Sequence, residues 1–463
     1  MEKKKNSSQT IEYGFITILS VISYLILMWI LTGRGAFSHN TYNSYALQAE
    51  AWTHGHLDLG QDYSHLELAM FNGKYYVSFP PFPSYILFPF AIFFGSNTPD
   101  ALLMWLEDII AALYLYKLAV KFTRNPKMSA LTTIFAMLGT NVTFNMLNPW
   151  VWFSAQTICF MLSIMAIYYA FEGKGGLSLF FWACSVGCRP MQAVFVPILL
   201  FILYKHESEI LRNERKYEEK SAEEENLEAE AEEYIETKEG VVPDGHTTDE
   251  INEDTPGTEQ ADSGILQDIL RIIKKRWKWA IPACVIALSY MVLNYLRFGS
   301  ITEFGHNYLP EFMEAEHGQF DIYYFSNNLK MLFNLPSFDE EGRMMIDHFG
   351  NLNFMIASPF DIFAIILFII VILGRKKGTI LADAGIIILC VTYMCITMMH
   401  KTMGGWHFGN RYANDIIPWL YLGVVLGLSK VPKAGKYQIP LLIFGICLNA
   451  VGTVVVYNGM HIG

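Results

Sequence analysis

Charged side chains are nearly absent from long stretches of this 463-residue sequence, 52% of which is apolar. The run that begins at Ile16, ITILSVISYLILMWIL, carries no charge. A helix needs about 20 apolar residues to cross a bilayer core of about 30 Å. No short period interrupts most of these runs, so they differ from the amphipathic helices of soluble proteins. The sequence therefore predicts an all-α, polytopic transmembrane helical bundle with about 11 spans.

Cysteine placement and the missing sequence motifs exclude further classes of protein. All seven cysteines lie in apolar segments, which argues against the disulfide framework of a secreted domain. The chain has no P-loop, no paired dinucleotide glycines, no HExxH and no GxSxG. Soluble nucleotide chemistry and a nucleic-acid partner are therefore not expected.

The net charge of −11 comes from one segment. Residues 207–262 carry 21 acidic and five basic side chains, which leaves 23 acidic and 28 basic side chains elsewhere. The acidic insert, 206–264, is too poor in apolar residues to fold alone. We expect a helix in its first half, around SAEEENLEAEAEEYIE, and disorder in its second half, around VPDGHTTDEINEDTPG.

Clusters of Lys and Arg indicate which ends of the spans face the cytoplasm. Lys3 to Lys5 predict a cytoplasmic N-terminus and a retained first span, and RIIKKRWK from Arg271 predicts the same side for the insert. Arg189-Pro190 in the middle of 176–204 predicts two short helices rather than one span. The other spans are expected at 13–33, 101–122, 128–147, 151–172, 279–297, 359–374, 379–398, 416–430 and 438–457. The expected parts are an N-terminal transmembrane module at 1–205 with an outer loop at 34–100, the cytoplasmic insert at 206–264, and a C-terminal transmembrane module at 265–463 with outer loops at 298–357 and 399–415.

The first outer loop combines a predicted interfacial helix with acidic residues. The helix is expected from Tyr42 to Trp52, and Asn72-Gly73 predicts a tight turn between two extended pieces. The proline-rich run from Phe79 is expected to form a re-entrant or interfacial element. Between them lie three carboxylates that could act as a general base, bind a metal, or be solvated loop charges: Asp58, Asp62 and Glu67.

The later outer loops carry basic and aromatic residues close to the membrane. Glu303 and His306 lie in a loop whose aromatic and amide side chains suit sugar binding or an ordinary interfacial belt. In the third loop, an arginine at Arg411 needs a partner or a ligand, and its planar fork suits phosphate. The structural alternative is that Arg411 pairs with Asp415, four residues further along a helix.

With these loops in view, the chain resembles the GT-C superfamily of membrane glycosyltransferases, and in particular its poorly characterised bacterial members. The likeness covers nearly the whole chain except the acidic insert. The segments that carry it are Tyr45 to Trp52, Gly55 to Leu59, Glu67, Asn72 to Tyr76, Phe79 to Pro83, Arg189-Pro190, Glu303 to Leu309 and Phe408 to Asp415. Many members carry an acid just after the first span, where this chain reads His39-Asn40-Thr41.

The resemblance implies an enzyme that moves a sugar from a polyprenyl-phosphate donor to a glycan, lipid or protein acceptor at the outer face of the plasma membrane. The transferred group would be a hexose or a pentose. The implied catalytic residues are Glu67, Asp62 and Asp58; the donor phosphate would contact Arg411, Lys74 and His407; and substrate would contact Glu303, His306, Tyr75, Tyr76 and Asp415. No cofactor is required by the sequence, although some members bind a divalent metal.

Two other functions fit the same set of spans. A transporter or flippase of lipid-linked sugars would share the bilayer location and the lipid site. Such proteins show internal repeats and charges at mid-membrane depth. The sequence has no repeat, and Glu107-Asp108 near the start of one span are the acids that would favour transport. A non-catalytic scaffold is favoured by the missing acid after the first span.

Overall fold

The computed structural model describes residues 2–38, 40–238, 258–335, 337–342, 344–345, 352–374, 380–404 and 407–458, and most of these residues are helical. The α-helices are α1 (Glu2–Thr32), α2 (Ser44–Thr53), α3 (Phe82–Phe94), α4 (Asp100–Thr123), α5 (Pro126–Leu138), α6 (Val142–Asn145), α7 (Val151–Phe171), α8 (Gly175–Val186), α9 (Val196–Lys238), α10 (Thr258–Arg276), α11 (Ala280–Phe298), α12 (Pro310–Met313), α13 (Phe325–Leu332), α14 (Phe354–Ala357), α15 (Pro359–Leu373), α16 (Ile380–Met398), α17 (Ile417–Lys430) and α18 (Gln438–Tyr457). Short 3₁₀ helices are η1 (Gly95–Asn97), η2 (Pro190–Phe195), η3 (Trp277–Trp279), η4 (His306–Tyr308), η5 (Ile322–Tyr324), η6 (Arg411–Ile416) and η7 (Pro432–Tyr437). The strands are β1 (Leu68–Phe71), β2 (Lys74–Val77), β3 (Ser337–Phe338) and β4 (Met344–Met345), so the all-α prediction is confirmed.

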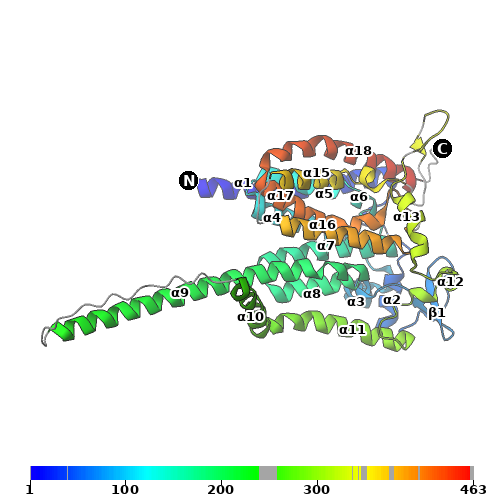
Figure 1. Ribbon diagram of the computed structural model, residues 1–463. Helices are drawn as coiled ribbons and strands as arrows, with labels where there is room; N and C mark the ends of the chain where they lie inside the picture. The colour runs from blue at the N-terminus through cyan, green and yellow to red at the C-terminus, as the bar shows by residue number, and fades with distance from the viewer. Residues whose placement is uncertain are drawn as a thin grey trace.

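The long apolar helices lie side by side in a bundle with roughly aligned axes (Figure 1). Helix α7 packs against both α4 and α8, α8 packs against α11, and α1 packs against α5. Their contacts form one continuous apolar core, in which the rings of Phe195 and Trp419 stack with centroids 4.5 Å apart. The bundle thus buries its larger aromatic side chains between helices rather than in a sheet.

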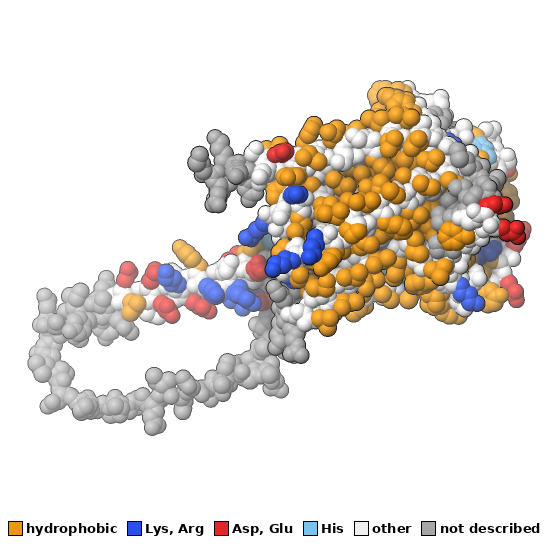
Figure 2. Space-filling model, turned by 90° about the horizontal axis from the view of Figure 1, so that it is seen from above, with side chains coloured by type: hydrophobic (Ala, Val, Ile, Leu, Met, Phe, Trp, Pro, Cys, Tyr) orange, Lys and Arg blue, Asp and Glu red, His pale blue; other side chains and the backbone are white. Residues whose placement is uncertain are grey.

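In the described part of the chain, four helical segments are long and apolar enough to cross a membrane: Ser7–Thr32, Val151–Phe171, Leu266–Phe298 and Pro432–Tyr457. Shorter apolar helices are Gly175–Val186, Pro359–Leu373 and Ala384–Met398. Hydrophobic side chains cover most of the flank of the bundle seen in Figure 2, whereas charged side chains gather at its two ends. The chain is therefore a membrane protein, and the number of 11 spans stays a prediction.

The two ends of the bundle differ. At one end, here called the loop end, lie α2, α3, α12 and β1; from the opposite end project the start of α1 and the long helix α9 (Figure 1). The start of α1 and the described first half of the acidic insert therefore share one end, and the described parts of the first and second predicted outer loops share the other. A cytoplasmic side for the first of these ends stays a prediction from the basic clusters.

The first loop folds largely as its sequence predicts. Helix α2 covers most of the predicted interfacial helix and buries Tyr45 and Ala49 against neighbouring elements, including α3. Strands β1 and β2 form an antiparallel hairpin around Asn72 and Gly73, whose φ angles of 52° and 74° suit the tight turn. Helix α3 has 13 residues, too few to span a bilayer, in agreement with the predicted interfacial element.

The chain breaks at Arg189-Pro190 as expected. Helix α8 ends at Val186, and η2 begins at Pro190 before α9 continues the chain. Proline cannot donate a backbone hydrogen bond and disfavours helical geometry in the residue before it, which explains the extended conformation of Arg189 (φ −139°, ψ 98°). The break carries the Arg189 side chain to the cavity described below.

Helix α9 has 43 residues and continues from the bundle through Lys238. The first half of the acidic insert is therefore helical, as predicted. The predicted disorder of VPDGHTTDEINEDTPG lies outside the described residues. Salt bridges from α10 to α9 join Arg215 with Asp268, Lys275 with Glu214 at 3.1 Å, and Arg276 with Glu207 at 2.9 Å.

Candidate functional site

A cavity of about 690 Å³ opens at the loop end of the bundle. Its wall combines the first and second loops with the start of α7, the break after α8, and the region from α16 to η6. This volume lies in the range of sites for small organic ligands. The ionisable acidic, basic and imidazole side chains on its wall are Glu67, Arg189, Glu303, His306, Glu311, His400 and Arg411.

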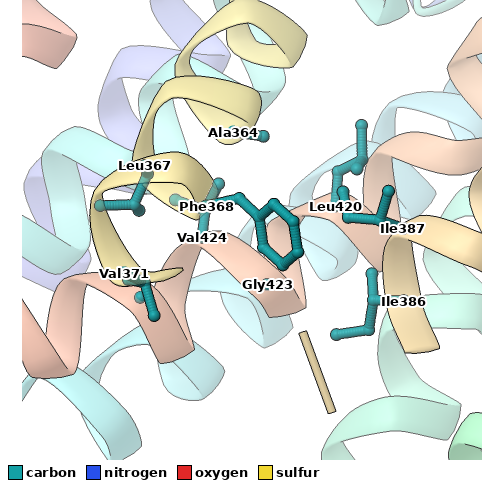
Figure 3. A pocket seen from close by; sticks show the side chains of 10 residues that line it. Ala364, Leu367, Phe368, Val371, Ile386, Ile387, Leu420, Gly423 and Val424 are labelled. Carbon is teal, nitrogen blue, oxygen red and sulfur yellow. The ribbon is translucent and has the colours of Figure 1, made fainter. Parts of the chain in front are cut away.

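A second pocket between α15, α16 and α17 is a packing gap of about 20 Å³ (Figure 3). The labelled side chains around it, including Phe368, Ile387 and Leu420, are all apolar. A water molecule needs polar partners, so this gap offers neither a hydrated site nor a chemical group.

Glu67 is the acid of the first loop that reaches the cavity. Its Oε2 accepts a hydrogen bond of 3.0 Å from the indole nitrogen of Trp152, at the start of α7. The side chain stays accessible from the cavity, yet the surrounding protein desolvates it and raises the pKa of its carboxyl. The nearby charge of Glu311 raises this pKa further, whereas Trp152 and Arg411 oppose the rise. A carboxylate with a raised pKa is a stronger base than an ordinary glutamate.

Arg411 is a cation on the cavity wall. The described part of the chain provides no carboxylate partner for it. The residue is buried, and its guanidinium lies 5.1 Å from the ring centroid of Tyr412. Its Nε has no hydrogen-bond partner among the described residues. Burial lowers the pKa of the guanidinium, which still remains charged at neutral pH because its ordinary value is so high. A buried cation without a partner is costly, so this position favours an anionic ligand.

The second arginine of the cavity is already neutralised. Arg189 forms a salt bridge of 2.9 Å with Asp415, and its guanidinium lies 4.9 Å from the Tyr412 ring. Asp415 also accepts hydrogen bonds from Tyr393 and Gln156. The interpretation that Arg411 pairs with Asp415 is therefore wrong. The break at Pro190 brings Arg189 to Asp415, and this long-range contact replaces the local helical pair.

Two histidines on the cavity wall are neutral at physiological pH. Burial lowers the pKa of His306, and burial lowers that of His400 to about 4. The Nδ1 of His306 lies 3.0 Å from the carbonyl oxygen of Ser78, and the Nδ1 of His400 lies 2.7 Å from that of Thr402. The Nε2 of His306 can exchange a hydrogen bond with a polar ligand, whereas the Nε2 of His400 lies 3.1 Å from the amide nitrogen of Gln319. Neither ring adds positive charge to the cavity.

Three candidates from the first loop lie away from the cavity. Lys74 forms a salt bridge of 2.9 Å with Asp58, and the lysine side chain is 57% exposed. This contact lowers the pKa of Asp58. Asp62 is exposed. None of the three is on the cavity wall, so Glu67 is the first-loop carboxylate positioned for chemistry there.

The remaining predicted substrate residues divide between wall and support. Glu303 lines the cavity, but its carboxylate accepts hydrogen bonds from Gly305 N at 2.6 Å and Asn307 Nδ2 at 2.7 Å. His407 is fully buried beside Gly404 and Arg411 and is not on the wall. The predicted substrate residues that belong to the supporting structure are Tyr75, Tyr76 and Asp415.

Sequence reasoning did not assign three groups that the cavity contains. Arg189 had a signal, because a charged residue within an apolar segment is a functional candidate by default. Trp152 lies at the start of a span and His400 just after one, where aromatic and imidazole side chains resemble an ordinary interfacial belt. Only the folded contacts distinguish these two from belt residues.

Metal binding has little support from the described residues. No group of three or more His, Cys, Asp or Glu side chains among them could hold a metal ion. Two carboxylates on the wall, those of Glu67 and Glu303, instead accept hydrogen bonds from protein donors. Acid–base and anion-binding chemistry is what this arrangement can perform with its own side chains.

The hydroxyl of Tyr393 is expected to stabilise the wall through its hydrogen bond to Asp415. Tyr393→Phe should lower the free energy of unfolding by about 1.5–3 kcal/mol, because a buried carboxylate loses a donor. Denaturant unfolding in detergent micelles measures this loss. Tyr323→Phe, at a 67% exposed tyrosine, is the control and should change stability little. Equal effects of the two changes would contradict the assigned role of Tyr393.

Together the fold and cavity define an all-α membrane protein with an acidic base candidate and, at the same end of its bundle, an arginine that has no carboxylate partner among the described residues. Neither protein-family models nor curated proteins match the sequence. Two solved structures of the oligosaccharyltransferase of Archaeoglobus fulgidus resemble the chain. For AglB in complex with an inhibitory peptide and a dolichol-phosphate, the identity is 12% and the TM-score 0.45, with 97% of this chain and 55% of that chain covered. For the apo form, the identity is 11% and the TM-score 0.44, with 97% and 56% covered. The chain thus spans little more than half the length of these proteins.

Proposed function

We propose that this protein is a membrane glycosyltransferase that moves a sugar from a polyprenyl-phosphate carrier to a hydroxyl acceptor at the outer face of the plasma membrane. The observation that carries the proposal is the presence in one cavity of two residues: Glu67, whose pKa is raised, and Arg411, which has no carboxylate partner among the described residues. The order of loop motifs shared with GT-C enzymes supports it. The N-terminus and the insert would then be cytoplasmic.

The proposed reaction needs one base and one anion-binding group. Glu67 takes the proton of the acceptor hydroxyl, whose oxygen attacks the anomeric carbon of the sugar. The bond between that carbon and the phosphate oxygen breaks, and the lipid phosphate leaves with its electron pair. Arg411 stabilises the charge that develops on this leaving group. The proton held by Glu67 is released to solvent after the product departs.

The side chains around these two residues suit a carbohydrate. Aromatic rings of Trp152, Phe312 and Tyr412 line the cavity and provide flat apolar faces. The Nε2 of His306 and the amide oxygen of Gln319, whose Nε2 lies 3.1 Å from His400, provide hydrogen-bonding groups for hydroxyls. A cavity that offers both flat apolar rings and uncharged hydrogen-bonding groups can bind a sugar without a further charged side chain.

The direct test is transfer in vitro by the purified full-length protein in lipid nanodiscs. A panel of radiolabelled polyprenyl-phosphate hexoses and pentoses is incubated with candidate acceptors, with EDTA or with added divalent cations. Sugar released from the carrier and recovered on an acceptor supports the proposal. Carrier that remains intact across the whole panel, with folded protein, overturns it.

A lipid-linked-sugar transporter is the second candidate, and one observation favours it. Glu107 and Asp108 are buried side by side in α4, and an oxygen of each has no hydrogen-bond partner among the described residues. Acids buried within a membrane-spanning helix often belong to transport pathways.

The double change Glu107→Gln with Asp108→Asn separates the two functions. The amides keep the size and hydrogen-bonding capacity of neutral acids, so the transferase proposal expects transfer close to that of the unchanged protein. The measurement pairs the transfer assay with movement of a fluorescent lipid-linked sugar across liposomes. Loss of lipid movement in the double variant, together with absence of transfer by the unchanged protein, would favour transport.

A further inference from the structure

Helix α10 lies at the end of the bundle opposite the cavity and precedes α11 in the chain. The two helices together are too long to form one membrane span. The apolar helical segment Leu266–Phe298 has 33 residues, which as one straight helix would measure about 50 Å, against a bilayer core of about 30 Å. The helix breaks at Arg276, whose φ of −118° and ψ of 8° are not helical. Helix α11 alone, with 19 residues, is long enough to cross. The residues before the break must therefore lie outside the core.

The direction of α10 supports this placement. In Figure 1 it runs across the axis of α11 rather than along it, beside the point where α9 leaves the bundle. A helix across the end of a membrane bundle lies roughly in the plane of the bilayer surface.

One face of α10 presents an exposed apolar stripe. Leu266, Ile269, Leu270, Ile273 and Trp277 recur at the spacing of one helical face, and each is more than a third exposed. The contacts of α10 with α9 use other positions, because Asp268, Lys275 and Arg276 form the salt bridges. The stripe thus points away from α9 and remains uncovered in the described part of the chain.

Positive charge flanks the stripe. Lys275 and Arg276 are neutralised by Glu214 and Glu207. Arg271, Lys274 and Lys278 are exposed and form no salt bridge with any described residue. On α10, Arg271 and Lys274 project to one side of the apolar stripe, and Lys278 follows just after the break, in η3. An uncovered apolar face beside three unpaired cations is complementary to an anionic lipid surface.

The junction between α10 and α11 carries anchors of the kind found at membrane–water interfaces. Trp277 and Trp279 lie in η3, and the guanidinium of Arg276 lies 5.1 Å from the ring centroid of Trp279. Trp279 packs onto Gly175 at the start of α8. A Cβ on residue 175 would lie 2.1 Å from the Trp279 ring. Tryptophan favours the headgroup region, so these rings fix the depth at which α10 leaves the bundle.

We infer that α10 is an interfacial helix that docks its apolar stripe on the anionic leaflet at the end of the bundle opposite the cavity. Leu266, Ile269, Leu270 and Ile273 enter the boundary between headgroups and acyl chains. Arg271, Lys274 and Lys278 bind lipid phosphates. The docked helix also holds the base of α9, through its salt bridges, at a fixed distance from the membrane.

The test uses the full-length protein in nanodiscs with a spin label at Leu270→Cys. The background replaces Cys284, Cys395 and Cys447 with alanine, because these are the cysteines that are not buried. In nanodiscs that contain phosphatidylglycerol, the label should be at least about threefold less accessible to a water-soluble nickel reagent than a label at Tyr217→Cys. Tyr217 is 79% exposed on the projecting part of α9 and is the aqueous control.

A charge variant and a lipid series complete the test. The triple change Arg271→Gln, Lys274→Gln and Lys278→Gln, or a nanodisc of phosphatidylcholine alone, should return the 270 label toward the accessibility of the 217 label. Equal accessibility of the two labels in anionic nanodiscs would overturn the inference. So would protection at 270 that ignores lipid charge and disappears when the protein is diluted to a monomer, because a second copy would then cover the stripe.

Discussion

Replacing Arg411 with glutamine is expected to lower the rate of sugar transfer by about 10²–10³-fold, the usual effect of removing one group that stabilises charge in a transition state. Arg411 is buried, faces the cavity, and has no carboxylate partner among the described residues, so in the proposed reaction its charge is available to the leaving phosphate. Glutamine keeps a hydrogen-bonding group but removes the charge. The measurement is kcat with a saturating polyprenyl-phosphate sugar.

Two further variants make the Arg411 prediction specific. Lys74→Gln also removes one positive charge, but from an exposed lysine outside the cavity, so it should leave kcat nearly unchanged. Arg411→Lys should recover part of the rate, because lysine restores the charge without the planar fork that stacks on Tyr412. Thermal unfolding of Arg411→Gln should not show a loss of stability, since the change removes an unpaired buried cation. A fully active Arg411→Gln enzyme would contradict the assignment.

Glu67→Gln is expected to lower transfer by about 10²–10⁴-fold, the range for loss of a general base. Glutamine can still accept the hydrogen bond from Trp152, so the wall should keep its shape while the proton acceptor is lost. Glu303→Gln is the matched control, because Glu303 lines the same cavity but its carboxylate is bonded to its own loop. Comparable losses in the two variants would remove Glu67 from the mechanism.

The pH dependence of transfer follows from the same residue. A general base works only when deprotonated, and burial raises the pKa of Glu67 above the ordinary glutamate value. Activity should therefore be full above the raised pKa and fall as the pH drops through it. The apparent pKa read from the acid limb of the kcat/KM profile should lie above the pKa of a solvent-exposed glutamate. Titration of His306 and His400 should cause no further change in activity near pH 6.5, because burial lowers the pKa of both rings.

Local sequence signals predicted local structure well. Asn72-Gly73 predicted the hairpin of β1 and β2, because this pair tolerates the left-handed backbone of the turn. Arg189-Pro190 predicted the break after α8, because proline cannot continue a helix. In both cases the physical cause lies within two adjacent residues, which a single sequence displays.

The composition of the cavity depended on contacts that no local signal encodes. Asp58, Asp62 and Glu67 look alike in sequence, yet only Glu67 reaches the wall, because the loop turns Asp58 outward to Lys74. The partner of Asp415 is Arg189, more than 200 residues away, rather than the nearby Arg411. Such choices follow from how helices pack, so the sequence predicted the kinds of residue in the site better than their pairing.

The Tyr412 ring has a consequence for handling the protein. Two guanidiniums, those of Arg189 and Arg411, contact this one ring at 4.9 and 5.1 Å, but among the described residues only Arg189 has a carboxylate to balance its charge. The two like charges therefore repel each other, and a bound anion would relieve this repulsion. A phosphate-bearing lipid would act as a folding ligand, adding stability in proportion to the logarithm of its concentration above its Kd. Detergent extraction that strips such lipids would leave the cavity end as the first part of the bundle to open.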